Sequence, residues 1–109
     1  MRVLVNLNRR SPTATMTATD DFGSFGIELI GVSAGHRVTA SDVACVGVLD
    51  SSGDVLVTVA RIGELAGDRS RDPDWTRRFG EMVEWAARRG WVDESGRLRA
   101  HVELSEVAR

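Results

Sequence analysis

Apolar and polar residues alternate in three stretches of the chain, and a period of two predicts strands with one buried face. The first stretch runs from Met1 to Leu7, and the second runs from Thr13 to Thr19, where threonine alternates with alanine and methionine. The third runs from Leu98 to Leu104 and carries arginine, histidine and glutamate on its polar face. We expect the first two strands to form a hairpin and the charged third strand to lie near a sheet edge.

Three other stretches are short and mostly apolar or small, which predicts strands at 27–32, 43–49 and 55–62. The polar run 50–54 joins the last two of these strands and predicts a hairpin loop. Because both faces of this hairpin are apolar, we expect it in the middle of the sheet, with a helix on one face. A second sheet layer or another subunit would then cover its other face.

One long helix is predicted over residues 73–89. Asp72 can cap its first amides, Pro73 suits the first helical position, and Gly90 can adopt the left-handed conformation that ends a helix. Trp91 would then fold back on the last turn in a Schellman motif. The apolar stripe of the helix comprises Trp75, Phe79, Met82, Val83 and Ala86.

These elements predict a single α+β domain over residues 1–109. The sheet, antiparallel or mixed, has about five to six strands, the long C-terminal helix packs on one face, and a final strand follows it. The chain has 109 residues, 42% of them hydrophobic, which suits one core of ordinary size. No apolar run reaches the roughly 18 residues of a membrane span, so no membrane partner is expected. Cys45 is the single cysteine, which favours a reduced thiol and a cytoplasmic location.

The charge pattern argues against nucleic acid as a partner. The chain carries 14 basic and 16 acidic side chains, all the basic ones being arginine, and its formal net charge is -2. The arginines alternate with acidic residues instead of forming a basic stripe, which is the usual feature of a nucleic-acid-binding face. The absence of lysine also excludes Schiff-base chemistry and a lysine-containing phosphate loop.

Three motifs with possible chemistry have simpler structural interpretations. Gly31 to Gly35 match the G-x-S-x-G pattern around a nucleophilic serine, Ser33, but no long helix is predicted after it, so a glycine turn is favoured. The acidic cluster Asp68, Asp72 and Asp74 is explained by helix capping. Two histidines and one cysteine lack the spacing of metal ligands, so we expect no metal site and no cofactor.

Two function hypotheses remain open. The first is a small binding or assembly module that acts through a protein surface and forms a homodimer, because the apolar hairpin needs a cover. Its further partner would be another protein or a small apolar ligand. The second is a small lyase, isomerase or cyclase, with His36, Glu28 or His101 moving a proton in an apolar pocket between helix and sheet.

Four aromatic residues are the candidate binding residues in either case: Phe22, Phe25, Trp85 and Trp91. Trp85 lies about 100° away from the centre of the helical stripe, where it either seals the sheet or anchors a partner.

Overall fold

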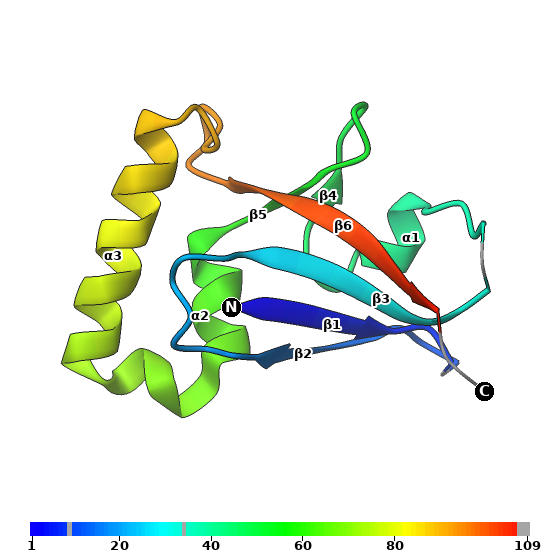
Figure 1. The fold of residues 1–109 in the computed structure, drawn as a ribbon, viewed down its shortest axis with the longest axis horizontal. Helices are drawn as coiled ribbons and strands as arrows, with labels where there is room; N and C mark the ends of the chain where they lie inside the picture. Colours follow the sequence, from blue (N-terminus) through cyan, green and yellow to red (C-terminus); the bar gives the residue numbers. More distant parts are fainter. Residues whose placement is uncertain (9, 34, 107–109) are drawn as a thin grey trace.

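Six strands form one mixed, curled sheet in the order β2-β1-β3-β6-β5-β4 (Figure 1). The computed structural model describes residues 1–8, 10–33 and 35–106. The strands are β1 (Arg2–Asn6), β2 (Thr13–Thr17), β3 (Gly26–Val32), β4 (Val48–Leu49), β5 (Val55–Val57) and β6 (Leu98–Glu106). The helices are α1 (Ala40–Val43), α2 (Val59–Ala66), the 3-10 helix η1 (Gly67–Arg71) and α3 (Pro73–Arg88). The α+β prediction is confirmed.

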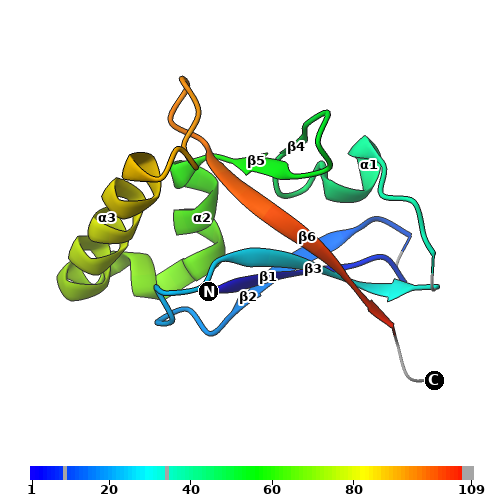
Figure 2. The same cartoon turned by 45° about the horizontal axis from the view of Figure 1, so that its top comes forward.

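The sheet combines parallel and antiparallel pairs. β1 is antiparallel to β2, as the hairpin prediction required, and parallel to β3, which is in turn parallel to β6. β5 is antiparallel to both β6 and β4. Figure 2 shows β6 crossing diagonally between the β1–β3 strands and the short β5–β4 pair. The helices pack against one face of this sheet, which we call the inner face, and the opposite face is the outer face.

Strand alternation places the apolar residues on the inner face. The buried residues of this face include Val3, Val5, Ile27, Leu29, Val55, Val57, Leu98 and Ala100. They pack in one cluster with Val43 of α1, Ile62 of α2, and Trp75 and Phe79 of α3. This core covers the inner face and fixes where α3 lies relative to the sheet.

Helix α3 follows its sequence signals closely. The Asp72 side chain accepts a hydrogen bond from the amide of Asp74 at 2.9 Å, and Pro73 occupies the first turn. At the other end, Gly90 has φ 80° and the amide of Trp91 donates to the carbonyl of Ala86 at 2.9 Å. The predicted Schellman motif is confirmed. The stripe is also confirmed, because Trp75, Phe79, Met82 and Ala86 are buried.

The strand predicted at 55–62 is wrong over its second half. β5 ends at Val57, and Thr58 then caps α2 by accepting a hydrogen bond from the amide of Arg61 at 3.0 Å. Ile62, which the sequence pattern placed in the strand, is fully buried as part of α2. The residues after Val57 therefore form a helix that covers the sheet, not an extension of it. Residues 63–71 form the end of α2, followed by η1.

The strand predicted at 43–49 is also wrong over most of its length. Val43 ends the short helix α1, and only Val48 and Leu49 pair with β5. At Gly47 a Cβ would lie 2.2 Å from the carbonyl oxygen of Leu56, so the close approach of the two segments requires glycine. The short β4 is an edge strand, not a central one. The predicted hairpin loop at 50–54 is present, but it joins two short strands at the sheet edge and not a central hairpin with one apolar face left uncovered. The reason for expecting a dimer through that hairpin is therefore lost.

The final strand also lies in a different place from the one predicted. β6 sits between β3 and β5 in the interior of the sheet, not near an edge. Its charged side chains Arg99, His101 and Glu103 are exposed on the outer face. The charged residues lie on the solvent-exposed face of a central strand. The same alternating pattern also occurs in edge strands, so the sequence alone does not distinguish the two positions.

Candidate functional site

The four aromatic residues singled out in the sequence surround one pocket between α3, the loop before β3 and the start of β6. Its volume is about 130 Å³. A cavity of about 150 Å³ takes a benzene ring, so the pocket has the size of one apolar side chain. The lining residues are Phe22, Gly23, Ser24, Phe25, Met82, Trp85, Ala86, Trp91, Leu98 and Arg99. We refer to this site as the aromatic pocket.

Helix α3 and its Schellman ending position the two tryptophans. The rings of Trp85 and Trp91 meet edge to face, with centroids 5.2 Å apart. Both side chains stay partly open to solvent, at 42% and 46% exposure. Trp91 was expected to fold back on the last turn of α3, and its amide does so by donating to Ala86 O. Because the Schellman hydrogen bonds fix the backbone at Trp91, its ring is held against Trp85.

The loop that carries Phe22 and Phe25 is fastened at several points. The amino group of Met1 donates to the carbonyl oxygens of Asp21 at 2.7 Å and of Ser24 at 2.9 Å, and burial lowers the pKa of this amine. Two further side chains hold the start of the loop: the Trp75 indole N–H donates to Thr19 O at 2.9 Å, and Arg69 binds both carboxylate oxygens of Asp20. The two phenylalanines are therefore presented by a fixed loop.

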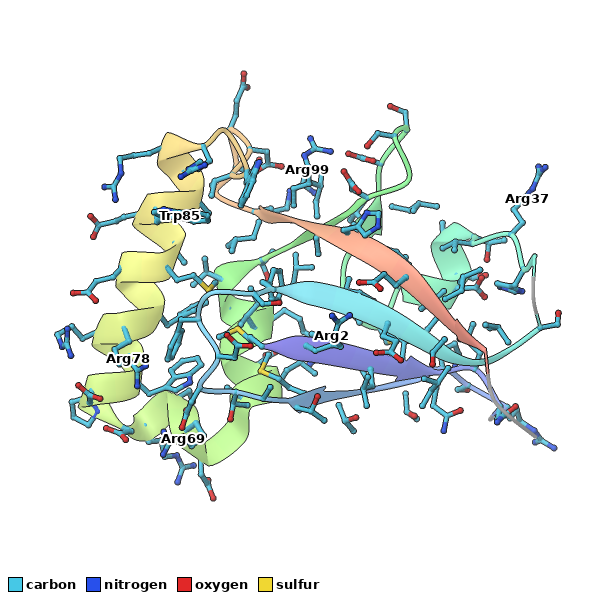
Figure 3. All side chains as sticks on the ribbon, viewed as in Figure 1. Arg2, Arg37, Arg69, Arg78, Trp85 and Arg99 are labelled. Atoms are coloured by element: carbon cyan, nitrogen blue, oxygen red, sulfur yellow. The ribbon has the colours of Figure 1, made fainter. Side chains whose placement is uncertain are left out.

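Two wider hollows adjoin the aromatic pocket. One, of about 340 Å³, shares Phe22, Met82 and Trp85 with it and extends to Arg78 and Glu81 on α3. The other, of about 270 Å³, shares Phe25, Trp91 and Arg99 and extends to Asp54 and His101. We call the three hollows together the aromatic groove. Figure 3 shows Arg78 and Trp85 along α3 and Arg99 near the start of β6.

Arginines lie over the aromatic rings of the groove. The guanidinium carbon of Arg78 is 4.7 Å from the ring centre of Phe22, and that of Arg89 is 4.6 Å from Trp85. Over residues 1–8, 10–33 and 35–106, no carboxylate lies within 4.0 Å of either guanidinium. Neither arginine was predicted from the sequence as a groove residue. The spacing of Arg89, one turn after Trp85, was the one local signal for such a contact.

At the β6 end of the groove, Arg99 is held by a carboxylate cluster in the turn between β4 and β5. Its guanidinium pairs with Asp50 and Asp54. The Ser52 hydroxyl donates to Asp50 at 2.7 Å, and together with Arg99 it lowers the pKa of Asp50 from 3.8 to about 2. These contacts fix Arg99 as part of the pocket wall and leave its charge largely neutralised.

The predicted acid–base residues do not line the aromatic pocket. His36 lies in the loop before α1, where its Nε2 is 2.9 Å from Asp42. Burial alone would raise the pKa of Asp42, but hydrogen bonds from His36 and Thr39 outweigh it and lower the pKa. Asp42 is thus engaged in capping α1 and in holding His36.

Glu28 and His101 lie on the outer face of the sheet. Glu28 is 3.8 Å from Arg2, and His101, 77% exposed, is 3.7 Å from Asp54. His101 reaches only the outer hollow of the groove. The three candidate acid–base residues therefore share no enclosed pocket with one another.

The other motifs have structural roles in the fold. Gly31 and Val32 lie in β3, where the register with β6 shifts, so the predicted glycine turn is wrong at its first residues. The turn comes later: Gly35 has φ 81°, the His36 amide donates to Ser33 O at 3.1 Å, and Ser33 is exposed. Residue 34 of this motif lies outside the described residues. Within 1–8, 10–33 and 35–106, no three His, Cys, Asp or Glu side chains gather closely enough to hold a metal ion. The helices of the described chain are too short or too polar to cross a bilayer.

Comparison of the chain with protein-family models, characterised proteins and solved structures gives no match.

Proposed function

We propose that this protein is a binding module whose aromatic groove holds a segment of another protein, one that presents an apolar side chain next to an acidic residue. The observation that carries the proposal is the convergence of Phe22, Phe25, Trp85 and Trp91 on one pocket. Tryptophan is enriched at the centre of protein interfaces, and large exposed aromatic clusters mark interaction sites.

The positive charges beside the groove indicate which residues the partner carries. Arg78 and Arg89 flank the groove over its aromatic rings and have no carboxylate partner among the described residues. A carboxylate of a bound segment can pair with either arginine, and an arginine stacked on an aromatic ring is already partly ordered for this purpose. An acidic residue beside the apolar anchor therefore matches the groove.

The shape and rigidity of the site also favour a peptide segment. Three adjoining hollows extend from Arg78 on α3 to His101 on β6, which suits an extended chain better than a compact small molecule. The loop that bears Phe22 is fixed by the Met1 amine, Trp75 and Arg69, so little ordering is needed on binding. The acid–base alternative gains no comparable support, since His36 and Glu28 lie outside the three hollows.

The test uses a randomised peptide library displayed on phage and selected on the wild-type protein. We expect the selected peptides to share an aromatic or branched aliphatic residue with Asp or Glu close by. In calorimetry, Trp85→Ala should weaken such a peptide at least about 30-fold, the equivalent of a hot spot of about 2 kcal/mol. Val48→Ala, which removes an exposed apolar side chain of β4, is the matched control and should leave affinity unchanged.

A double variant, Arg78→Gln with Arg89→Gln, tests the charge. It should weaken acidic peptides and remove most of the salt dependence of binding, while a peptide with Asn or Gln in place of the acid should be unaffected. Absence of a shared motif, or equal affinity for Trp85→Ala and wild type, would overturn the proposal.

A further inference from the structure

The outer edge of β2 is an open strand without the usual protection against pairing. β2 forms one edge of the sheet, and the opposite edge, β4, is only two residues long. Sheet edges are commonly protected by charged residues, proline, bulges or short length. β2 has five residues and a regular register with β1, the one proline near it, Pro12, precedes the strand, and no charged residue occurs between Ser11 and Thr19.

The hydrogen bonds of β1 show which residues of that strand face β2. The Leu7 amide donates to Ile30 O at 2.9 Å, and Met1 O accepts from the Gly26 amide. The odd-numbered residues of β1 thus direct their backbone groups toward β3. Because these groups alternate along a strand, the even-numbered residues, such as Leu4, direct theirs toward β2.

The register between β2 and β1 shows which backbone N–H and C=O groups of β2 point away from β1. Leu4 faces Thr15, so the threonines of β2 pair with β1, and Ala14 and Met16 direct their N–H and C=O groups outward. The described part of the chain supplies no other backbone partner for these two residues. The edge therefore offers two donors and two acceptors.

This edge is complementary to a second copy of itself. In an antiparallel pairing centred on Thr15, Ala14 of one molecule lies opposite Met16 of the other, and their outward groups exchange hydrogen bonds. On the outer face, Thr13 lies opposite Thr17, and the two Thr15 side chains meet at the axis. Threonine pairs across strands are favourable, and alanine leaves room for methionine.

The charges at the two ends of the strand also select the antiparallel arrangement. Arg10 precedes the uncharged run, and Asp20 and Asp21 follow it. Antiparallel pairing brings the basic end of one copy to the acidic end of the other, whereas parallel pairing would bring like charges together. Asp20 is already paired with Arg69, but its side chain remains 54% exposed and accessible.

We propose that β2 pairs antiparallel with β2 of a second copy of this chain, centred on Thr15, so that two sheets join into one. This surface is separate from the aromatic groove, and the pairing would present two grooves in one assembly. A contact limited to one strand edge is small, so association should be weak and concentration-dependent.

Analytical ultracentrifugation of the full chain, from about 10 µM to about 1 mM, tests the pairing. Wild type should shift from monomer to dimer within this range. Thr15→Lys and Thr15→Glu should each raise the dissociation constant at least about tenfold, because two like charges meet at the axis. Mixing the two variants should restore association through the heterodimer. Ala87→Lys and Ala87→Glu, which change an exposed residue of α3, are matched controls and should dimerise like wild type.

The outcomes test the dimer and its register separately. A wild-type protein that stays monomeric at the highest concentration overturns the proposal. Weakening in both Thr15 variants without rescue in the mixture overturns the register, since only pairing centred on Thr15 places the two charges together. Circular dichroism of each variant shows whether the fold is retained, and Ala14→Pro, which removes an outward N–H, gives an independent block of the edge.

Discussion

Gly63 lies inside α2, a helix that the apolar pattern of the sequence did not predict. A Cβ built at Gly63 meets no atom within 4 Å, and the same is true of Gly80 in the middle of α3. Neither glycine has a positive φ, so alanine fits both positions without strain. Substitution at these sites therefore changes backbone freedom and helix propensity, with little contribution from packing.

The magnitude follows from helix propensity. Glycine is about 0.8–1.0 kcal/mol less favourable than alanine in a helix interior, so Gly63→Ala should stabilise the protein by about 1 kcal/mol. Valine is a poorer helix former than alanine, and Gly63→Val should recover only about half of this gain. Gly80→Ala and Gly80→Val should give the same order, since α3 is a helix on both sequence and structural grounds. The two alanine effects should add, because neither methyl group contacts a neighbour.

Urea denaturation followed by tryptophan fluorescence measures these changes, with Trp75 as the buried reporter. In thermal unfolding, about 1 kcal/mol corresponds to a rise of about 4 to 8 °C for a small domain. The decisive result is the order of stability at position 63: alanine should be the most stable, valine intermediate and glycine the least stable. A Gly63→Val variant at least as stable as Gly63→Ala, with the helical order intact at Gly80, would refute the helix at α2.

Two further predictions concern the ends of the groove. Because hydrogen bonds from Ser52 and Arg99 lower the pKa of Asp50 from 3.8 to about 2, its ionised form stabilises the fold above pH 3.8, and this contribution is lost as the pH falls toward 2. The free energy of unfolding of wild type should therefore decline more steeply over this range than that of Asp50→Asn, and equal slopes in acid urea titrations would contradict this. Gly90→Ala should cost about 1 kcal/mol, since Gly90 has φ 80°, and an unchanged urea midpoint would show that the Schellman ending is dispensable.

Helix α3 could be predicted from sequence because all its signals are local. Asp72 and Gly90 lie within two residues of the helix ends and the apolar stripe follows the helical repeat, so each signal lies in neighbouring positions of the sequence. The sequence signals for helix α2 were ambiguous, because apolar residues between Val55 and Ile62 occur at both strand and helix spacing. Strict alternation would have placed Arg61 on the buried face with Val55 and Val57. Its position, with Thr58 as a cap, was the signal for a change of period.

Sheet order and the arginine contacts depend on tertiary structure, which no local pattern contains. The alternation in β6 correctly predicted a strand with one polar face, but the neighbours of that strand are set by chain topology. Trp85 was identifiable from the sequence because its position lies about 100° away from the centre of the apolar stripe of α3. Arg78 and Arg89 were not, because a long flexible side chain can reach many partners and the fold selects one.

The fold moves the expected site of self-association from the apolar residues between Val43 and Ile62 to the edge strand β2. The apolar residues between Val43 and Ile62 suggested a surplus of apolar surface, but α2 uses part of them to cover the inner face that the strands create. The core is satisfied within one chain, so a second copy is not needed to bury it. The longer of the two sheet edges, β2, leaves backbone groups of Ala14 and Met16 without a partner strand, and a partner recruited there must supply hydrogen bonds more than apolar area. Such pairing adds strands without altering the groove, so loss of dimerisation in Thr15→Lys should leave peptide binding by a single groove unchanged.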